Sequence, residues 1–141
     1  MATTTSPDTE LAGALVQTMH VLQDLYAETS RPLGLTPQQA HLLCVLLGGP
    51  LGMTELSRIL SIERSSLTSM VDRLERRDLV TRIPDPSDRR AFHIELTDGG
   101  LALAHDAHNG FTSRIDAMTK GLTATDRRAL TTTLQKIVSE A

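Results

Sequence analysis

Apolar residues recur at helical spacing along most of this chain, and they alternate with polar residues in only one short stretch. The first helical stripe runs over residues 7–28 and ends before Pro32, a residue that terminates helices. Its start, at Ser6 and Pro7, pairs an N-cap residue with a proline in the first turn, which is typical of helix N-termini. The apolar positions of this predicted helix are Leu11, Leu15, Leu22, Leu25 and Tyr26, broadened by Val16 and Met19.

A second helix is predicted from the capping residues at its start. Thr36 is followed by Pro37, and Gln39 stands where its side chain completes a capping box with Thr36. Residues 42–47 are all apolar, so this helix is expected to lie buried at the centre of the fold. The glycine- and proline-containing segment 48–50 ends it.

Two short amphipathic helices follow, joined by only about three residues. The second of them spans about residues 64–77, and its apolar residues fall at positions i, i+3, i+4 and i+7. Two helices joined by so short a turn form a helix-turn-helix. The apolar faces consist of Met53, Leu56, Ile59 and Leu60 in the first helix and of Leu67, Met70, Val71 and Leu74 in the second.

Positive charge concentrates around this helix pair, although the chain as a whole is acidic. The chain has a net charge of −3, yet residues 58–90 contain eight arginines and six acidic residues and therefore have a net charge of +2. A basic segment on a helix-turn-helix is the electrostatic pattern of a nucleic-acid-binding surface, and the alternative is a solvated helix with paired charges. The polar face of the second helix carries Ser65, Thr68, Ser69, Asp72, Arg73 and Arg76, which can hydrogen-bond base edges or phosphates.

The one alternating stretch predicts a β-hairpin. Residues 80–83 form its first strand, and residues 92–96 alternate in a second strand with one buried face. The connection, residues 84–88, contains two prolines and is expected to be a turn. The adjacent Arg89 and Arg90 are expected in the same charged hairpin tip. A hairpin of this kind, or wing, can deliver an arginine to a nucleic-acid groove. The side chains expected on the buried face are Phe92, Ile94 and Leu96.

Two further helices are predicted after Gly100. A helical pattern extends from there to Met118, Gly121 interrupts it, and Thr123 begins a last helix. An isolated helix is marginal in water, so the first and last helices are expected to pack together, within the chain or across a two-fold axis. The expected fold is mostly α with a small β-wing: a winged helix-turn-helix flanked by N- and C-terminal helices. The apolar stripe of the last helix is Leu130, Leu134, Ile137 and Val138.

The sequence lacks the signals of membrane, secreted and catalytic proteins. No apolar run approaches the roughly 18 residues of a membrane span, and residues 1–8 lack a signal-peptide pattern, so we expect a cytoplasmic protein with no membrane partner. The single cysteine, Cys44, excludes an intramolecular disulfide. No glycine-rich phosphate loop, nucleophile motif or metal-protease pattern is present, so we expect neither an enzyme nor a bound cofactor. The aromatic content of 2% argues against a stacking platform for single-stranded nucleic acid.

The hairpin carries the most specific motif in the chain, which matches D-x-R-x-x-x-[VI]-x-L-T-x-x-G at every fixed position. Together with the order of the predicted elements, this motif resembles the wing signature of the MarR family of bacterial transcriptional regulators. The resemblance covers nearly the whole chain, and residues 67–75 are also similar to the family's recognition helix. The matching residues of the wing are Asp88, Arg90, Ile94, Leu96, Thr97 and Gly100.

The resemblance implies a homodimer that binds double-stranded DNA. Residues 1–34 and 98–141 are then the helical dimerisation domain, and residues 35–97 are the winged helix-turn-helix DNA-binding domain. In the family the recognition helix lies in a major groove, and the wing arginine, here Arg90, enters the adjacent minor groove, which concentrates negative potential where it is narrow. The implied function is a ligand-responsive repressor that binds a pseudo-palindromic operator. The expected DNA contacts are Ser65, Ser66, Thr68, Ser69, Arg73, Arg76, Asp88, Arg89 and Arg90.

Two wing residues and one alternative function complete this expectation. Arg89 is expected to contact a phosphate. Asp88 either holds the wing arginines by a charge-assisted hydrogen bond or caps the turn, and both roles fit the sequence. The alternative is a winged-helix module that binds other proteins and has no DNA function. Such a module is expected to present an acidic or apolar recognition face rather than arginines.

Several positions depart from the usual residues of the family. Ser61 stands at a turn position that usually holds glycine, and Glu63 stands where an N-cap serine is usual. Asp78 replaces the glycine that usually ends the recognition helix, and it tolerates a left-handed conformation better than most residues. Ser69 occupies a position that is often basic in relatives. These departures leave the expected fold unchanged and bear on the operator sequence.

The resemblance also implies a sensor site, because family members respond to small phenolic compounds, oxidants or metal in a cleft between the dimerisation helices and the DNA-binding lobe. His20, His41 and Cys44 are the candidates for lining a ligand pocket. A zinc-responsive regulator is one alternative, with His41, His105 and His108 as ligands, because zinc-sensing relatives use histidines of the second and fifth helices. A redox-responsive regulator is another, although oxidant-sensing relatives carry their cysteine in the first helix. Cys44 lies instead in the most apolar helix, where burial raises the pKa of a thiol.

Overall fold

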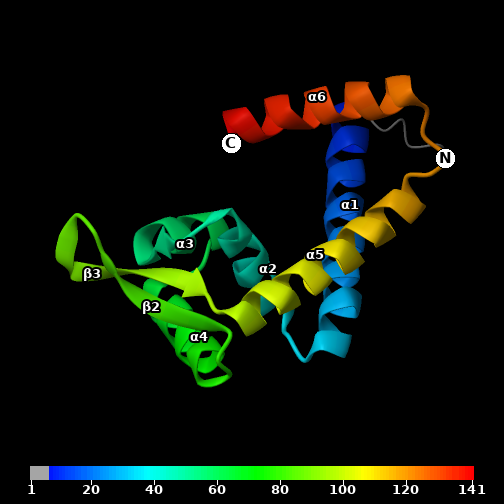
Figure 1. The fold of residues 1–141 in the computed structure, drawn as a ribbon. Coiled ribbons are helices and arrows are strands. Elements are labelled where there is room, and N and C mark those ends of the chain that lie inside the picture. Colours follow the sequence, from blue (N-terminus) through cyan, green and yellow to red (C-terminus); the bar gives the residue numbers. More distant parts are fainter. Residues whose placement is uncertain (1–6) are drawn as a thin grey trace. The chain divides into compact units, whose positions relative to one another are not determined.

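The computed structural model of the chain describes residues 7–141, which form mostly helices and one small sheet (Figure 1). The predicted fold class is confirmed, and the predicted N-cap Ser6 lies outside the described residues. The elements are α1 (Pro7–Ser30), η1 (Arg31–Leu33), α2 (Pro37–Val45), η2 (Leu46–Gly48), β1 (Leu51–Gly52), α3 (Met53–Leu60), α4 (Arg64–Arg76), β2 (Val80–Asp85), β3 (Asp88–Leu96), α5 (Asp98–Met118) and α6 (Ala124–Glu140).

The chain divides into two compact units. The first ends at Phe111 and contains α1 to α4, the sheet and the first part of α5, and the second, Thr112–Ala141, contains the end of α5 and α6. Among residues 7–141, no helix combines the length and the apolar character needed to cross a membrane.

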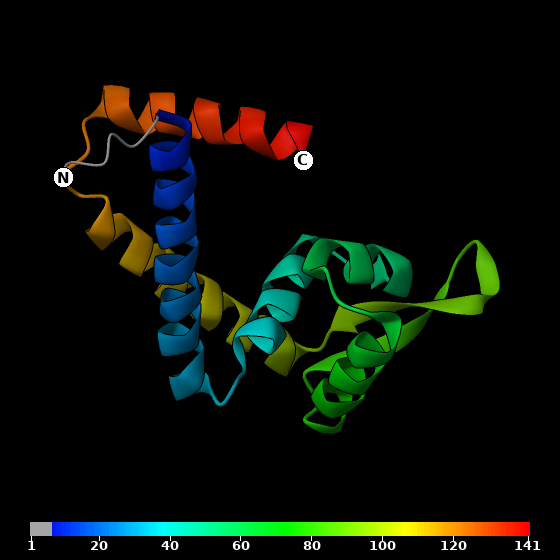
Figure 2. The ribbon, with the colours of Figure 1, turned by 180° about the vertical axis from the view of Figure 1, so that it is seen from behind.

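The core of the first unit gathers around α2, as its apolar run predicts. Leu42 and Leu43 of α2 are fully buried, together with Leu56 of α3, Leu67 of α4 and Ile94 of β3. Full burial of one such side chain is worth roughly 1.5–3 kcal/mol, so this cluster holds the helix pair against the sheet. Figure 2 shows the hairpin β2–β3 projecting as a wing from the lobe that residues 35–97 form around this core.

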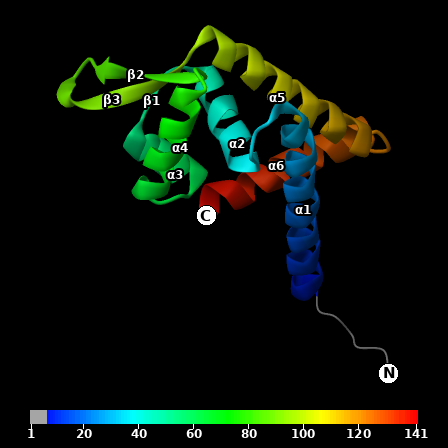
Figure 3. The ribbon, with the colours of Figure 1, turned by 90° about the horizontal axis from the view of Figure 1, so that it is seen from below.

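The sheet has three antiparallel strands in the order β1-β3-β2, so β2 is an edge strand (Figure 3). In β1, Leu51 pairs with Ile94 and Gly52 pairs with His93. Sequence reasoning missed β1, because a strand of two residues contains no alternation. This short strand holds the base of β3 beside α3.

The predicted turn at residues 84–88 was too long. Pro84 and Asp85 belong to β2, and Arg89 and Arg90 belong to β3 rather than to the turn. The turn closes over fewer residues because side chains cap it: Asp85 Oδ1 accepts hydrogen bonds of 2.8 Å from the backbone N–H and the hydroxyl of Ser87. Pro84 is tolerated because an edge strand need not donate every backbone hydrogen bond.

The predicted buried face of β3 is only partly buried. Ile94 is fully buried and Leu96 is half-buried, whereas Phe92 is 48% exposed and corrects the prediction. Phe92 pairs with Pro84 in the outer part of the wing and is not among the residues of the core cluster. Its ring lies instead under Arg82, with the guanidinium carbon 6.0 Å from the ring centroid.

Local capping explains where several helices start. The predicted capping box of α2 is present, with Thr36 Oγ1 accepting from the backbone of Gln39 and the Gln39 side chain accepting from the backbone of Thr36. α5 starts at Asp98 rather than after Gly100, because the Thr97 hydroxyl accepts a hydrogen bond of 3.0 Å from the Gly100 N–H. Gly100 is required there, since a Cβ at this position would lie 1.8 Å from the carbonyl oxygen of Leu79.

In the second unit, a capping box fixes the start of α6. Thr123 and Asp126 form the capping box that begins α6. Arg127 Nη2 donates a hydrogen bond of 2.7 Å to the carbonyl oxygen of Thr119, which joins α6 to the end of α5. The exposed apolar residues of α6 are Leu130, Leu134, Ile137 and Val138.

Candidate nucleic-acid interface and ligand pocket

The helices α3 and α4 are joined by the three-residue segment 61–63, as predicted. Ser61 adopts a left-handed conformation, with φ 53° and ψ 46°. The Ile62 N–H donates to the Ser57 carbonyl at 3.2 Å, and the Ser57 hydroxyl donates to the Ile62 carbonyl at 2.6 Å. These two bonds fix the angle between the two helices. Glu63 is the N-cap of α4 but makes no side-chain capping hydrogen bond.

The predicted DNA-contacting residues of α4 all lie on its exposed side, opposite the buried Leu67, Met70, Val71 and Leu74. One flank of that exposed side faces the start of α2 and the other faces the wing. Ser66, Ser69 and Arg73 lie on the α2 flank. The predicted contacts on this exposed side are Ser65, Ser66, Thr68, Ser69, Arg73 and Arg76.

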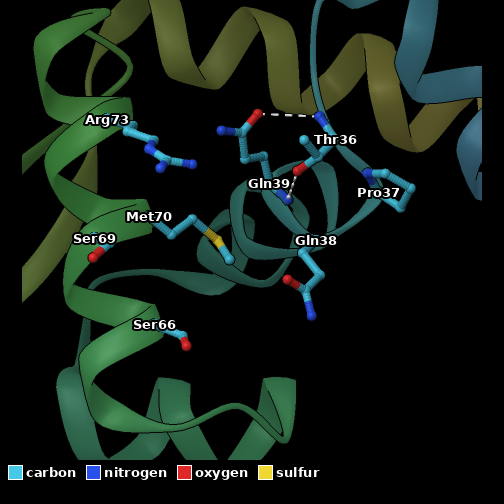
Figure 4. Close-up of a pocket in the computed structure, with 8 residues that line it drawn as sticks. All are labelled: Thr36, Pro37, Gln38, Gln39, Ser66, Ser69, Met70 and Arg73. Carbon is cyan, nitrogen blue, oxygen red and sulfur yellow. Dashed lines mark hydrogen bonds between the residues drawn. The ribbon is translucent and has the colours of Figure 1, made fainter.

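A cavity of about 560 Å³ separates α4 from the start of α2 (Figure 4). Met70 and Arg73 extend from α4 toward Gln39, whose side chain closes the capping box with Thr36. The capping box therefore holds one wall of the cavity in place. The complete lining is Thr36, Pro37, Gln38, Gln39, Ser66, Ser69, Met70 and Arg73.

At the wing, Asp88, Arg89 and Arg90 are exposed on β3. Asp88 Oδ1 accepts a hydrogen bond of 2.9 Å from the backbone N–H of Arg90. Of the two roles that the sequence left open for Asp88, turn capping is the contact that the structure contains. The guanidinium groups of Arg89 and Arg90 belong to exposed side chains, where a phosphate or a groove edge can reach them.

Sequence reasoning missed Arg64, the first residue of α4. Arg64 Nη1 donates a hydrogen bond of 3.2 Å to Thr54 Oγ1 of α3, so its guanidinium is held at the start of both helices. It lines a groove of about 250 Å³ together with Arg90 and His93 of the wing. Asp85, on the same groove, lies 3.3 Å from His93, and hydrogen bonds from Ser87 lower the pKa of Asp85. The sequence signal that could have identified Arg64 is a basic residue directly after the turn of the helix-turn-helix.

A second residue missed from the sequence is Arg82 on β2. Its Nη2 lies 2.6 Å from Asp72 Oδ1, and its Nη1 lies 2.6 Å from Glu75 Oε1. The hydrogen bond to Asp72 is the main cause that raises the pKa of Arg82, and the negative charge of Glu75 adds to it. The wing and α4 are therefore tied by one guanidinium and two carboxylates.

His41 lines a pocket of about 400 Å³ that also includes Gln23, Tyr26 and Gln38. The Tyr26 ring stacks on Phe111 with centroids 4.1 Å apart, and it lies 5.9 Å from the His41 ring in a tilted arrangement. Burial lowers the pKa of His41 and raises that of Tyr26, so both groups favour their neutral forms. The size and the aromatic wall suit a small organic molecule.

The other predicted sensor residues are not gathered at this pocket. His20 is exposed on α1, and Cys44 is half-buried, with its Sγ donating to the Ala104 carbonyl at 3.8 Å. Burial raises the pKa of the Cys44 thiol, as expected for this helix. His105 and His108 lie exposed on α5. Within residues 7–141, no three His, Cys, Asp or Glu side chains stand close enough to hold a metal ion.

Comparisons with known proteins point to one family. The sequence profile of the MarR family matches residues 33–91, from η1 into β3. The chain is 32% identical over 129 residues to the multiple antibiotic resistance protein MarR of Escherichia coli, covering 89% of this chain and 90% of that protein. It is 36% identical over 106 residues to the transcriptional repressor NicR of Pseudomonas putida, covering 74% of this chain and 66% of that protein.

The fold agrees with a solved protein–DNA complex. The crystal structure of a mutant MarR from Escherichia coli with operator DNA superposes with a TM-score of 0.75 at 30% identity. The match covers 94% of this chain and 99% of that chain, so it includes the helices outside the helix-turn-helix as well as the wing.

Proposed function

This chain belongs to the MarR family, and we propose that it is a transcriptional regulator that binds double-stranded operator DNA as a homodimer. The observation that carries the proposal is the placement of the exposed polar side of α4 and the wing arginines on one lobe. The complex of MarR with operator DNA supports it. The curated relatives are named as a resistance protein and a repressor, which favours a binding role over catalysis and repression over activation.

We assign α4 to the major groove, which is wide enough to admit a helix. The serine and threonine hydroxyls can bond base edges or phosphates, and the arginines can neutralise phosphates. The proposed contacts from this helix are Ser65, Ser66, Thr68, Ser69, Arg73 and Arg76.

The wing is assigned to the adjacent minor groove. Arg90 is the proposed groove contact and Arg89 the proposed phosphate contact, with Asp88 capping the turn beneath them. One sugar–phosphate backbone separates a major groove from its neighbouring minor groove. That backbone would pass over the groove between α4 and the wing, where Arg64 lies, so we add Arg64 as a phosphate contact.

The dimer is proposed to form through residues 1–34 and 98–141, with residues 35–97 as the DNA-binding domain. Two helices support this division by the apolar side chains that they expose. α1 exposes Leu11, Leu15, Val16 and Met19, and α6 exposes Leu130, Leu134, Ile137 and Val138. Exposed stripes of this size mark protein interfaces, and a two-fold dimer would place two recognition helices on half-sites about 10 base pairs apart.

The pocket beside His41 is the proposed effector site. Its Tyr26 ring, stacked on Phe111, offers an aromatic wall, and Gln23 and Gln38 offer hydrogen bonds to a small aromatic compound. The pocket joins α1 to the start of α2, so a bound compound can change how the DNA-binding lobe is held. We propose that the protein acts in the cytoplasm, because its DNA target lies there.

The wing contact is tested by Arg90→Ala on an operator selected from genomic fragments. Loss of the groove contact is expected to weaken specific binding by about 1–3 kcal/mol, measured by fluorescence anisotropy. The thermal midpoint should stay unchanged, because the side chain is exposed. Arg31→Ala removes the same charge from η1 and should leave binding nearly unchanged.

The alternative function makes the opposite prediction. A protein–protein module would retain no genomic fragment, and Arg90→Ala would then have no DNA affinity to change. Equal operator affinity of the Arg90→Ala variant and the wild type would remove the wing from the mechanism while leaving α4 in it.

A further inference from the structure

Arg82 occupies a position on β2 where strand alternation would place an apolar side chain. Val80 is buried and pairs with Leu96, and Arg82, two residues further, pairs with the buried Ile94. Side chains two apart in a strand lie on the same face, so Arg82 lies on the face that meets the core. Its side chain is only 23% exposed. A cation in such a place needs partners that replace its lost hydration.

Two carboxylates on the wing flank of α4 supply these partners. Asp72 and Glu75 are three residues apart on the helix, and each receives one guanidinium nitrogen of Arg82 at 2.6 Å. The planar fork of arginine can serve both at once, which the single ammonium of a lysine does less well. Phe92 of β3 lies at cation–π distance from the same guanidinium. One side chain therefore joins α4, β2 and β3.

Within the part of the chain that the structure describes, no buried residue attaches the wing beyond Arg82 to the rest of the fold. Every residue from 83 to 92 is exposed or half-buried. On the other side of the sheet, β1 pairs only with Ile94 and His93, at the base of β3. Along β2, the bonds of the Arg82 guanidinium to Asp72 and Glu75 thus tie the recognition helix to the edge strand of the wing ahead of its tip.

We propose that Arg82 is a positioning residue that couples the wing to α4, so that the recognition helix and Arg90 meet their two DNA grooves as one rigid body. This inference rests on the proposed DNA-binding function. A wing that is already ordered loses less conformational entropy on binding than a free hairpin does. Arg82 needs no DNA contact for this role, because it acts through the placement of Arg90.

The first test replaces the guanidinium while keeping an aliphatic stem. Arg82→Met should fold with a thermal midpoint close to that of the wild type, because the side chains of Asp72 and Glu75 are 47% and 40% exposed, so water hydrates both carboxylates once the guanidinium is removed. Its operator affinity should fall about tenfold. Arg77→Met is the matched control, since Arg77 is also at the end of α4 but donates to the Gly34 carbonyl, away from the wing. Equal losses in the two variants would overturn the proposal.

A second variant separates positioning from charge. Arg82, Asp72 and Glu75 carry a net charge of −1, and the triple variant Arg82→Met/Asp72→Asn/Glu75→Gln carries none at these positions. Charge alone therefore predicts equal or tighter DNA binding by the triple variant, because the interface becomes less negative. The coupling predicts weaker binding. Equal or tighter binding would overturn it.

A double-variant cycle tests whether Arg82 affects DNA affinity through the placement of Arg90 in the wing. In the Arg90→Ala background, Arg82→Met should cost little further affinity, because the contact that it positions is already lost. Fully additive losses would contradict the proposed route. Arg82→Lys keeps the charge and one of the two bonds, so it should recover part of the affinity.

A readout without DNA keeps this inference distinct from the proposed function. Backbone relaxation of residues 86–90 in the free protein should show larger fast motions in Arg82→Met than in the wild type or in Arg77→Met. Unchanged wing motion would overturn the coupling even if DNA affinity fell. If wing motion increases while the wild type binds no operator, the coupling stands and the regulator function fails.

Discussion

Two residues with left-handed backbone shape the ends of the recognition helix. Ser61 has φ 53° before α4, and Asp78 has φ 58° after it. The left-handed region costs an ordinary residue roughly 1–2 kcal/mol, and glycine pays no such steric penalty. Both turns therefore carry strain that the core residues of α3 and α4 offset.

We expect Ser61→Gly to raise the free energy of unfolding by about 0.5–1 kcal/mol, because the removed strain exceeds the entropy that glycine loses. Urea denaturation measures this change. Ser69→Gly is the matched control in the middle of α4 and should lower stability by about 0.5–1 kcal/mol. A destabilising Ser61→Gly would mean that the serine side chain itself holds the turn.

His41 gives stability a pH dependence with a defined sign. Burial lowers the pKa of His41 below its ordinary value of 6.5 in the folded protein, so the unfolded chain binds the proton more readily. Above about pH 6.5 His41 is neutral in both states, and as pH falls below that value its protonation favours unfolding. His41→Gln should reduce the drop in thermal midpoint between about pH 7.5 and pH 5.5. His20→Gln, which replaces an exposed histidine of α1, is the control for the loss of an imidazole elsewhere in the chain.

At the scale of elements, the junction between the wing and α5 depends on one close approach. Gly100 packs against the backbone of Leu79, where a Cβ would lie 1.8 Å from the carbonyl oxygen. At Gly99 the nearest atom to a Cβ would be 3.7 Å away, an ordinary contact. Of these two neighbouring glycines, Gly100 therefore has no room for a side chain, whereas Gly99 does.

Gly100→Ala should destabilise the protein by about 3 kcal/mol or more, because neither backbone can move without displacing the core. Gly99→Ala should be neutral or slightly stabilising, since alanine is the better helix former. Thermal unfolding followed by circular dichroism distinguishes the two. Similar effects of both substitutions would show that α5 shifts easily at its start.

The elements that sequence reasoning placed well are those with local signals. The capping box of Thr36 and Gln39 and the apolar stripe of α4 depend on residues close together in the sequence, so they could be predicted. β1 could not be predicted, because its pairing with the distant strand β3 decides it. The wing turn was predicted too long, because its two prolines indicate a turn, whereas Pro84 is tolerated in an edge strand. Phe92 was expected inside because alternation says which face a residue occupies but not how far the core extends.

The candidate site shows the same division. The exposed side of α4 followed from its helical period. Arg64 and Arg82 were missed, because their roles depend on Thr54 of α3 and on the carboxylates of α4, which lie apart in sequence. His41 was predicted at a ligand pocket, but the Tyr26 ring beside it and the Phe111 ring stacked on Tyr26 come from helices that only the fold brings together.

At the scale of the whole molecule, α1 and α6 carry apolar residues that a single chain leaves exposed to water. Water contact at such stripes is unfavourable, and a second copy of the chain would cover them. The proposed dimer also doubles the DNA contacts, so its assembly and its operator affinity should be lost together.

Leu134→Asp should therefore convert dimers to monomers in sedimentation velocity, because it places a charge in the proposed apolar interface. Operator affinity should fall in parallel, while the lobe itself stays folded. Thr132→Asp adds the same charge to α6 off the apolar stripe and should leave the dimer intact. A dimeric Leu134→Asp protein would place the interface elsewhere.

Because Cys44 is half-buried, a fluorescent label can be attached selectively to a cysteine introduced in the wing. Thiolates are the reactive form of cysteine, and the raised pKa of this single thiol slows its reaction with labelling reagents at neutral pH. A cysteine introduced by Ser87→Cys would stand exposed at the wing tip and react first. A fluorophore attached there reports the arrival of DNA or effector in real time, with the native thiol left in place.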